Sequence, residues 1–215
     1  NMAEKEGDKR GIGWCFINIG IVYLKKGDYN IALDYYNRSL KIREELGDKR
    51  GMGNNLNSIG NLYFDIGDYD IALDYYTRSL NIFEEIGDKY GMVYNPGNIG
   101  RLYLGKGDFD KALDYYTRSL KMAEDIGDES RMEWLPVYIG IVYYYKGDSK
   151  KAVKYLEKSF VIQKETRFGG KLSLWTTTYL YLTYKKLGKA YDKKKLQILI
   201  KKDREILFDL NFGIF

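Results

Sequence analysis

Adjacent acidic residues recur at equal intervals, as Glu44–Glu45, Glu84–Glu85 and Glu124–Asp125. Paired carboxylates can bind a hard cation such as calcium or act as general acid and base, so these positions are the first candidates for chemistry. Each pair comes near the end of a segment with helical spacing, where acidic side chains are ordinarily solvated. We therefore interpret the pairs as solvated helix ends and expect no metal site.

Other reactive groups are few. Cys15 is the single cysteine and the chain contains no histidine, so a thiolate at Cys15 would lack an imidazole base. The sequence contains no phosphate-binding loop, nucleophile elbow or dinucleotide-binding fingerprint. We interpret Cys15 as a buried thiol on a helix, and we predict that the protein is not an enzyme and needs no cofactor.

The dipeptide Gly-Asp recurs at a constant interval, from Gly7–Asp8 and Gly27–Asp28 onward to Gly147–Asp148. A fixed period of this kind indicates a repeat protein in which each unit stacks on its neighbours. Glycine can end one helix in the left-handed conformation, and aspartate can cap the next. Between the dipeptides, apolar residues follow the spacing of a helix face rather than alternating. The pattern therefore predicts antiparallel helices joined by tight turns.

Residue types at fixed places in each helix pair resemble the tetratricopeptide repeat family. The first helix of each repeat carries a bulky residue, an isoleucine, a glycine and a tyrosine: Phe16, Ile19, Gly20, Tyr23; Leu56, Ile59, Gly60, Tyr63; Pro96, Ile99, Gly100, Tyr103; Pro136, Ile139, Gly140, Tyr143. The second helix carries a small residue, a large residue and a serine: Ala32, Tyr36, Ser39; Ala72, Tyr76, Ser79; Ala112, Tyr116, Ser119; Ala152, Leu156, Ser159. The period of roughly 40 residues exceeds the family's usual length of about 34 residues. It is similar to that of a subgroup found in Pins-type adaptors and bacterial regulators.

The resemblance implies an all-α fold, a right-handed superhelical α-solenoid of antiparallel helix pairs. We expect four pairs over residues 9–166, with the boundaries 9–46, 49–86, 89–126 and 129–166. A degenerate and basic fifth pair, which could cap the stack, is expected over 171–208, followed by an apolar tail at 209–215. The two prolines, Pro96 and Pro136, predict a kink or a late start in the first helix of repeats three and four.

In stacks of this family the first helices line a concave groove, and the positions not needed for packing face it. Asparagines gather there, and their amides carry the donors and acceptors that suit an extended peptide backbone. Arg101 could bind a carboxylate of the ligand, and aromatic residues could form flanking pockets. A solvated polar face without a ligand is the competing interpretation. The predicted peptide-binding residues are Trp14, Asn18, Asn54, Asn57, Asn61, Tyr94, Asn98, Arg101, Trp134 and Tyr138.

We therefore predict a non-catalytic scaffold that binds an extended or helical peptide of a partner protein in this groove. The alternative is a ligand-sensing regulatory segment of a larger signalling protein, such as a cyclase, a kinase or a transcription regulator. A structural spacer without a groove ligand is a weaker third interpretation. The repeat is interrupted at both ends of the chain, so we expect a fragment of a larger protein and head-to-tail self-association through the open ends of the stack.

The chain carries a net charge of +5, and its positive charge is concentrated after Lys151. A basic segment can bind nucleic acid, acidic protein or anionic lipid. Few aromatic residues interleave with the basic ones, so we interpret the segment as a solvated helix face and expect neither nucleic acid nor membrane as a partner. The sequence shows no signal peptide and no apolar run long enough to span a membrane, and we expect a cytoplasmic protein.

Overall fold

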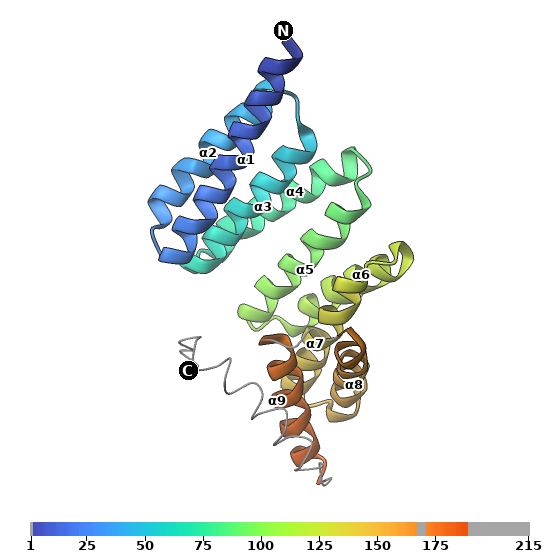
Figure 1. The fold of residues 1–215 in the computed structure, drawn as a ribbon. Coiled ribbons are helices and arrows are strands. Elements are labelled where there is room, and N and C mark those ends of the chain that lie inside the picture. The colour runs from blue at the N-terminus through green and yellow to red at the C-terminus, as the bar shows by residue number, and fades with distance from the viewer. Residues whose placement is uncertain (1, 167–170, 189–215) are drawn as a thin grey trace. The chain divides into compact units, whose positions relative to one another are not determined.

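The structure is a computed structural model that describes residues 2–166 and 171–188. These residues form nine α-helices and no strand (Figure 1). The helices are α1 (Met2–Lys26), α2 (Tyr29–Glu45), α3 (Lys49–Ile66), α4 (Tyr69–Glu85), α5 (Lys89–Gly105), α6 (Phe109–Ile126), α7 (Glu129–Tyr145), α8 (Ser149–Thr166) and α9 (Lys171–Lys186). The expected second helix of the fifth pair, the apolar tail and part of the basic segment lie outside the described residues.

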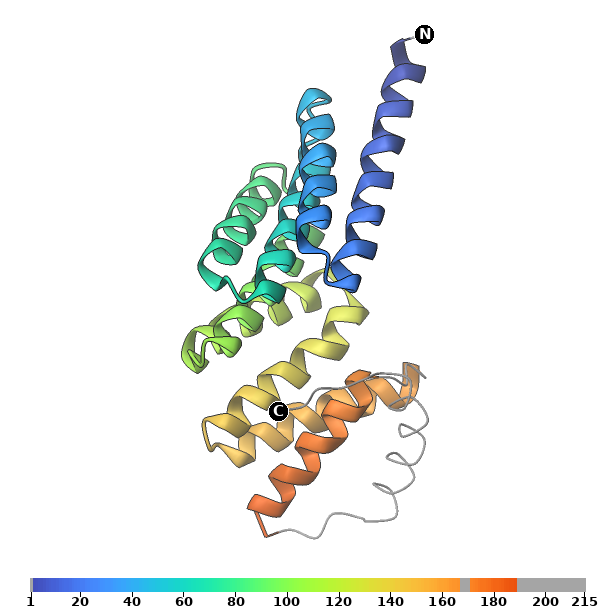
Figure 2. The same ribbon diagram turned by 90° about the vertical axis from the view of Figure 1, so that its left-hand side faces the viewer.

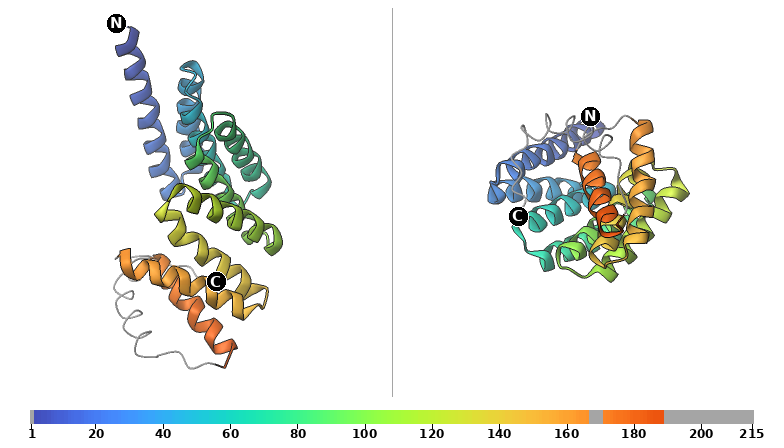
Figure 3. Two further views of the ribbon diagram at one scale, coloured as in Figure 1. Left: turned by 90° about the vertical axis from the view of Figure 1, so that its right-hand side faces the viewer. Right: turned by 90° about the horizontal axis from the view of Figure 1, so that it is seen from below.

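The chain divides into two compact units, residues 1–107 and residues 108–215. In the first unit each helix from α1 to α5 packs against the next, and α3 also contacts α1 and α5 (Figure 2). In the second unit α6 to α9 pack in the same consecutive order, and α7 also contacts α9 (Figure 3). The prediction of an all-α solenoid of antiparallel helix pairs is confirmed within each unit.

The Gly-Asp dipeptides form the turns between helices. Gly67 ends α3 with a φ of 93°, a left-handed conformation that glycine adopts without steric cost. The next residue, Asp68, caps α4, because its carboxylate accepts the backbone N–H of Ile71. Gly7–Asp8 is an exception, since α1 runs through it without a turn. In the other turns the glycine N–H bonds back to a carbonyl of the helix before it, whereas among the described residues no helix precedes α1.

The helices of each pair interlock through a small residue on one helix and a large one on the other. Tyr36 and Tyr76 are fully buried, with their rings on Gly20 and Gly60. A serine one turn further along binds the first helix of its own repeat. Ser79 Oγ donates to the carbonyl of Gly53 over 2.6 Å, in the same way that Ser39 Oγ donates to Gly13. The family-type positions therefore form the contact between paired helices.

The prolines do not delay their helices. α5 begins directly after the capping residue Asp88, and α7 begins directly after Asp128, as α3 begins directly after Asp48. Both helices continue through Pro96 and Pro136. The expected late start is therefore wrong: both prolines are buried, and the packing of these helices outweighs the backbone hydrogen bond that each proline removes. A kink at these positions stays a prediction.

Cys15 is exposed, so its interpretation as a buried thiol is wrong. The same place in later repeats holds Asn55, Asn95 and Leu135, and all three are fully buried. Those positions lie in helices that follow another helix pair, whereas α1 has no preceding pair among the described residues. Val22 and Ile12, also on α1, are 52% and 46% exposed for the same reason.

None of the described helices combines the length and the apolar character that are needed to cross a bilayer.

Candidate functional site: a polar face on α3 and α5

In the first unit the predicted binding residues of α3 and α5 lie at helical spacings that place them on one side of each helix. Because α3 contacts α5 directly, these two sides meet. Hydrogen bonds between side chains join the two helices at two places along this contact. We call the set Asn54, Asn57, Asn61, Asp65, Asn98 and Arg101 the polar face.

Asn57 and Asn98 form a buried amide pair across the two helices. Asn98 Nδ2 donates to Asn57 Oδ1 over 2.8 Å, and the two residues are 8% and 7% exposed. Each therefore uses one of its groups within the protein. Both amides keep capacity for another contact, because an amide oxygen can accept two hydrogen bonds and an amide nitrogen can donate two.

Asn61 connects three helices through its amide oxygen. Its Oδ1 accepts the Tyr76 hydroxyl of α4 over 2.8 Å and Arg101 Nη2 of α5 over 3.0 Å. The Arg101 guanidinium also lies over the Phe64 ring, with Cζ 4.3 Å from the ring centroid, which is a cation–π arrangement. The cationic group of Arg101 is thus fixed in position before any ligand binds.

Desolvation changes the acid–base properties around Asn61. Burial raises the pKa of Tyr76 to about 12, and the nearby Arg101 opposes this shift. Asp65 lies one helical turn after Asn61. The residue as a whole is exposed, but the surrounding protein removes part of the water from its carboxyl group and raises the pKa of that group, again with Arg101 opposing. The polar face therefore holds a positioned cation and an accessible carboxylate whose charged form is incompletely solvated.

The other predicted residues of the first unit lie around this network. Asn54 is exposed, and Tyr94 is half-buried near Tyr76. On α1, Trp14 is 64% exposed, and Asn18 Nδ2 donates to the Trp14 carbonyl over 3.0 Å. The structure therefore brings the residues of α3 and α5 together, whereas Asn18 bonds within its own helix.

The two predicted residues of the second unit belong to an aromatic cluster. The Tyr138 ring lies 5.4 Å from Trp134 and 5.4 Å from Tyr116, centroid to centroid. Trp175 of α9 packs edge-on against Tyr138 at 5.8 Å. Trp134 and Tyr138 therefore pack in part against each other and against their neighbours.

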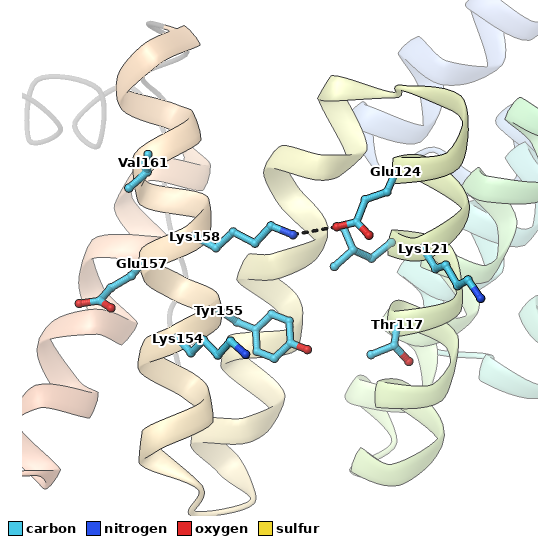
Figure 4. A pocket seen from close by; sticks show the side chains of 9 residues that line it. Thr117, Lys121, Glu124, Lys154, Tyr155, Glu157, Lys158 and Val161 are labelled. Carbon is cyan, nitrogen blue, oxygen red and sulfur yellow. Dashed lines mark hydrogen bonds and ion pairs between the residues drawn. The ribbon is translucent and has the colours of Figure 1, made fainter.

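The acidic pairs contribute to surface ion pairs. Glu45 pairs with Lys9 at 2.9 Å, and this hydrogen bond lowers the pKa of Glu45. Glu124 of α6 pairs with Lys158 of α8 at 2.8 Å, across a hollow of about 820 Å³ in the second unit (Figure 4). This hollow lies between the second helices of two repeats. Its lining residues are Thr117, Leu120, Lys121, Glu124, Lys154, Tyr155, Glu157, Lys158 and Val161.

Sequence reasoning missed three residues of the polar face and its surroundings. Tyr76 was assigned to packing alone, although a tyrosine hydroxyl usually forms a hydrogen bond when it is buried. Phe64 was missed because aromatic residues were sought only at the flanks. Its place three residues after Asn61, on the same side of α3, was the available signal. Asp65, one helical turn after Asn61 on the same side of α3, was not selected as a binding residue.

Comparisons with known proteins identify the type of repeat. Two family models, both described as tetratricopeptide repeat, match residues 51–125 and residues 14–46. No curated protein matches the chain. The assignment to the subgroup with the longer period stays a prediction.

Several solved structures are similar in fold. BtubC (BKLC) from P. vanneervenii has a TM-score of 0.73 at 23% identity, over 91% of this chain and 79% of that chain. Aspartyl phosphate phosphatase F from Bacillus subtilis has a TM-score of 0.79 at 14% identity, over 93% and 51%. The Rap conjugation gene regulator of the plasmid pLS20, in complex with the Phr* peptide, has a TM-score of 0.74 at 18% identity, over 92% and 54%. The chain spans about half the length of the last two proteins.

At these identities the likeness to solved structures shows the fold alone. The family models match the chain itself, and they cover the helix pairs that carry the polar face. The glycine, tyrosine and serine contacts described above occupy the family's positions. The chain is therefore a member of the tetratricopeptide repeat family.

Proposed function

We propose that the first unit binds a peptide segment of a partner protein along the polar face and that the protein acts as a scaffold without catalysis. The observation that carries this proposal is the position of Arg101, which is held by Asn61 Oδ1 and by the Phe64 ring. A guanidinium fixed in this way can bind a carboxylate without a further loss of side-chain freedom. The exposed amide of Asn54 adds a donor and an acceptor for a peptide backbone.

The comparisons support this proposal at the level of protein class. The pLS20 regulator, which has a similar fold, is in complex with a peptide. Another similar structure is named a phosphatase, so the absence of catalysis is part of the proposal and rests on the missing histidine, which leaves the single Cys15 without an imidazole base. Contributions of Trp14, Asn18, Trp134 and Tyr138 to peptide binding, and a cytoplasmic location, also stay predictions.

A displayed library of random dodecapeptides, panned against the protein, tests the proposal. Selected peptides are then synthesised with a fluorophore and titrated by fluorescence polarisation against three forms of the protein. The first variant, called the groove variant, carries Asn54→Ala and Arg101→Gln on the polar face. The control variant carries Arg78→Gln and Asn81→Ala, two exposed residues of α4. Circular dichroism melts establish that all three forms are folded.

We expect the groove variant to bind at least about tenfold more weakly, equivalent to roughly 1.4 kcal/mol, because it loses a charge-assisted contact. The control variant should bind like the original protein. A library that yields no specific peptide, or peptides that bind all three forms equally, would contradict a binding site on the polar face.

The alternative function, a regulatory segment that senses a peptide, uses the same site. The pLS20 protein is named a gene regulator, which makes this alternative worth testing beside the first. If a selected peptide changes the radius of gyration in small-angle X-ray scattering, the sensor is favoured. A peptide that binds without such a change favours the scaffold.

A further inference from the structure

The side of the polar face nearest α1 contains a buried hydroxyl group that the proposed function does not use. Tyr36 and Tyr76 stand at the same place in successive repeats, and both are fully buried. The Tyr76 hydroxyl donates to Asn61, but the place of Asn61 in the first repeat is taken by Ile21, whose side chain has no acceptor. Among the described residues, the Tyr36 hydroxyl has no hydrogen-bond partner.

An unusual acid lies within electrostatic range of this hydroxyl group. Tyr36 packs in one cluster with Leu62 of α3, and Asp65 follows Leu62 by three residues, nearly one turn along the same helix. At the place of Asp65 the other repeats have Lys25, Gly105 and Tyr145, so an acid occurs there in one repeat of four. Burial raises the pKa of Tyr36 to about 12, and the negative charge of Asp65 adds to this shift.

Asp65 is not neutralised within the part of the chain that the structure describes. Neither Lys25 of α1 nor any other described residue forms an ion pair with it. Desolvation raises the pKa of Asp65, so its carboxylate has lost some of its water without gaining a direct cationic contact. Arg101 lies within electrostatic range but is engaged with Asn61 and Phe64 on the α5 side.

We infer that Asp65, supported by the Tyr36 hydroxyl, forms a subsite for a cationic side chain of the bound peptide, a lysine ammonium or an arginine guanidinium. The cation would pair with one carboxylate oxygen of Asp65 from the solvent side. The other oxygen would turn toward the interior and accept the buried Tyr36 O–H. A carboxylate and a hydroxyl that lack partners in the free protein would thus both gain one. This inference rests on the proposed function, and it adds a preference for basic peptides to it.

The test uses the random dodecapeptide library on the original protein, on Asp65→Asn and on Asp74→Asn. Asp74 is a matched control because it is an exposed acid of α4, paired with Arg78 at its surface. Sequencing of each selected pool gives the frequency of lysine and arginine at every peptide position. One selected peptide is then synthesised with its basic residue and with norleucine in its place.

We expect lysine and arginine to be enriched at one fixed position in the pools from the original protein and from Asp74→Asn, and not in the Asp65→Asn pool. Norleucine should weaken binding to the original protein about tenfold and leave binding to Asp65→Asn nearly unchanged. Tyr36→Phe, which keeps the buried ring, should reduce the affinity for the basic peptide a few-fold.

The failures of the two proposals are distinguishable. Peptides that depend on Arg101 but show no basic preference, or a preference that persists in Asp65→Asn, would overturn the cation subsite alone. A library that yields no specific peptide for the original protein would overturn the proposed function and the subsite with it.

Discussion

Asn98 Nδ2 donates a hydrogen bond of 2.8 Å to Asn57 Oδ1, although the two residues are 41 positions apart in the sequence. The bond joins α3 to α5, the first helices of successive repeats, at a place where both side chains are buried. Two residues that the sequence indicated as ligand contacts therefore also connect neighbouring repeats. Their replacement should affect stability whether or not a ligand is present.

A double-mutant cycle on this pair measures that contribution. We expect Asn57→Ala and Asn98→Ala each to lower the free energy of unfolding by about 1–3 kcal/mol, because each leaves a buried amide without its partner. The coupling energy should be about 1 kcal/mol, which urea denaturation of the two single variants and the double variant can determine. Additive effects would mean that the bond does not contribute to stability.

At Asn55 we expect a substitution to raise the stability of the protein. It is fully buried, and neither polar atom of its amide has a hydrogen-bond partner among the described residues. Leu135 is equally buried at the same place in the fourth repeat. We expect Asn55→Leu to raise the free energy of unfolding by about 1–2 kcal/mol, because it removes an unsatisfied polar group and adds apolar burial.

The same substitution at the exposed Asn54 is the control for Asn55→Leu, and it should change the urea midpoint little. A lower midpoint for Asn55→Leu would show that the larger side chain does not fit between α3 and the preceding helix pair.

Alanine substitutions of two glycines, each on the first helix of its repeat, distinguish the effect of close packing from that of helix propensity. A Cβ at Gly60 would lie 2.7 Å from Tyr76 Cδ1, whereas a Cβ at Gly11 would meet nothing within 4 Å. We expect Gly60→Ala to lower the free energy of unfolding by about 1–3 kcal/mol through overpacking. Gly11→Ala should raise it by up to about 1 kcal/mol, because alanine is the better helix former. Thermal melts of both variants check the sign, and a stabilised Gly60→Ala would contradict the close fit of the tyrosine ring.

The sequence predicted those features that depend on contacts within one repeat. Gly60, Tyr76 and Ser79 could be assigned to packing because the same residue types return at the same places in other repeats. The exposure of Cys15 could not be predicted, because it depends on which helix covers α1 and not on the type of repeat.

The location of the polar face was predicted from the sequence, but the hydrogen bonds between its residues were not. Asn57, Asn61, Asn98 and Arg101 were placed on one side of their helices by spacing alone. Spacing gives no information on side-chain directions, so the bonds among these residues appeared only with the structure. Tyr76 joined them because a buried hydroxyl group takes the nearest acceptor, which in this repeat is Asn61.

The pH dependence of stability gives a test of Asp65 that needs no ligand. Desolvation raises the pKa of its carboxyl group in the folded protein above the value of about 4 in the unfolded chain. The folded state therefore binds the proton more tightly, and the contribution of Asp65 to stability is fully present below the unfolded pKa and is lost as the pH rises through the folded pKa. Asp65→Asn should have a higher urea midpoint than the original protein near neutral pH, with a difference that disappears once the solution is acidic enough to protonate Asp65 in both states.

Glu45 serves as the control, because its hydrogen bond with Lys9 lowers the pKa of its carboxyl group. Its contribution to stability is present above the unfolded pKa and is lost as the pH falls through the folded pKa. Glu45→Gln should therefore have a slightly lower midpoint near neutral pH, opposite in sign to Asp65→Asn. If Asp65→Asn instead lowered the midpoint at neutral pH, Asp65 would have a favourable partner in the free protein, and the cation subsite would lose the unpaired carboxylate on which it depends.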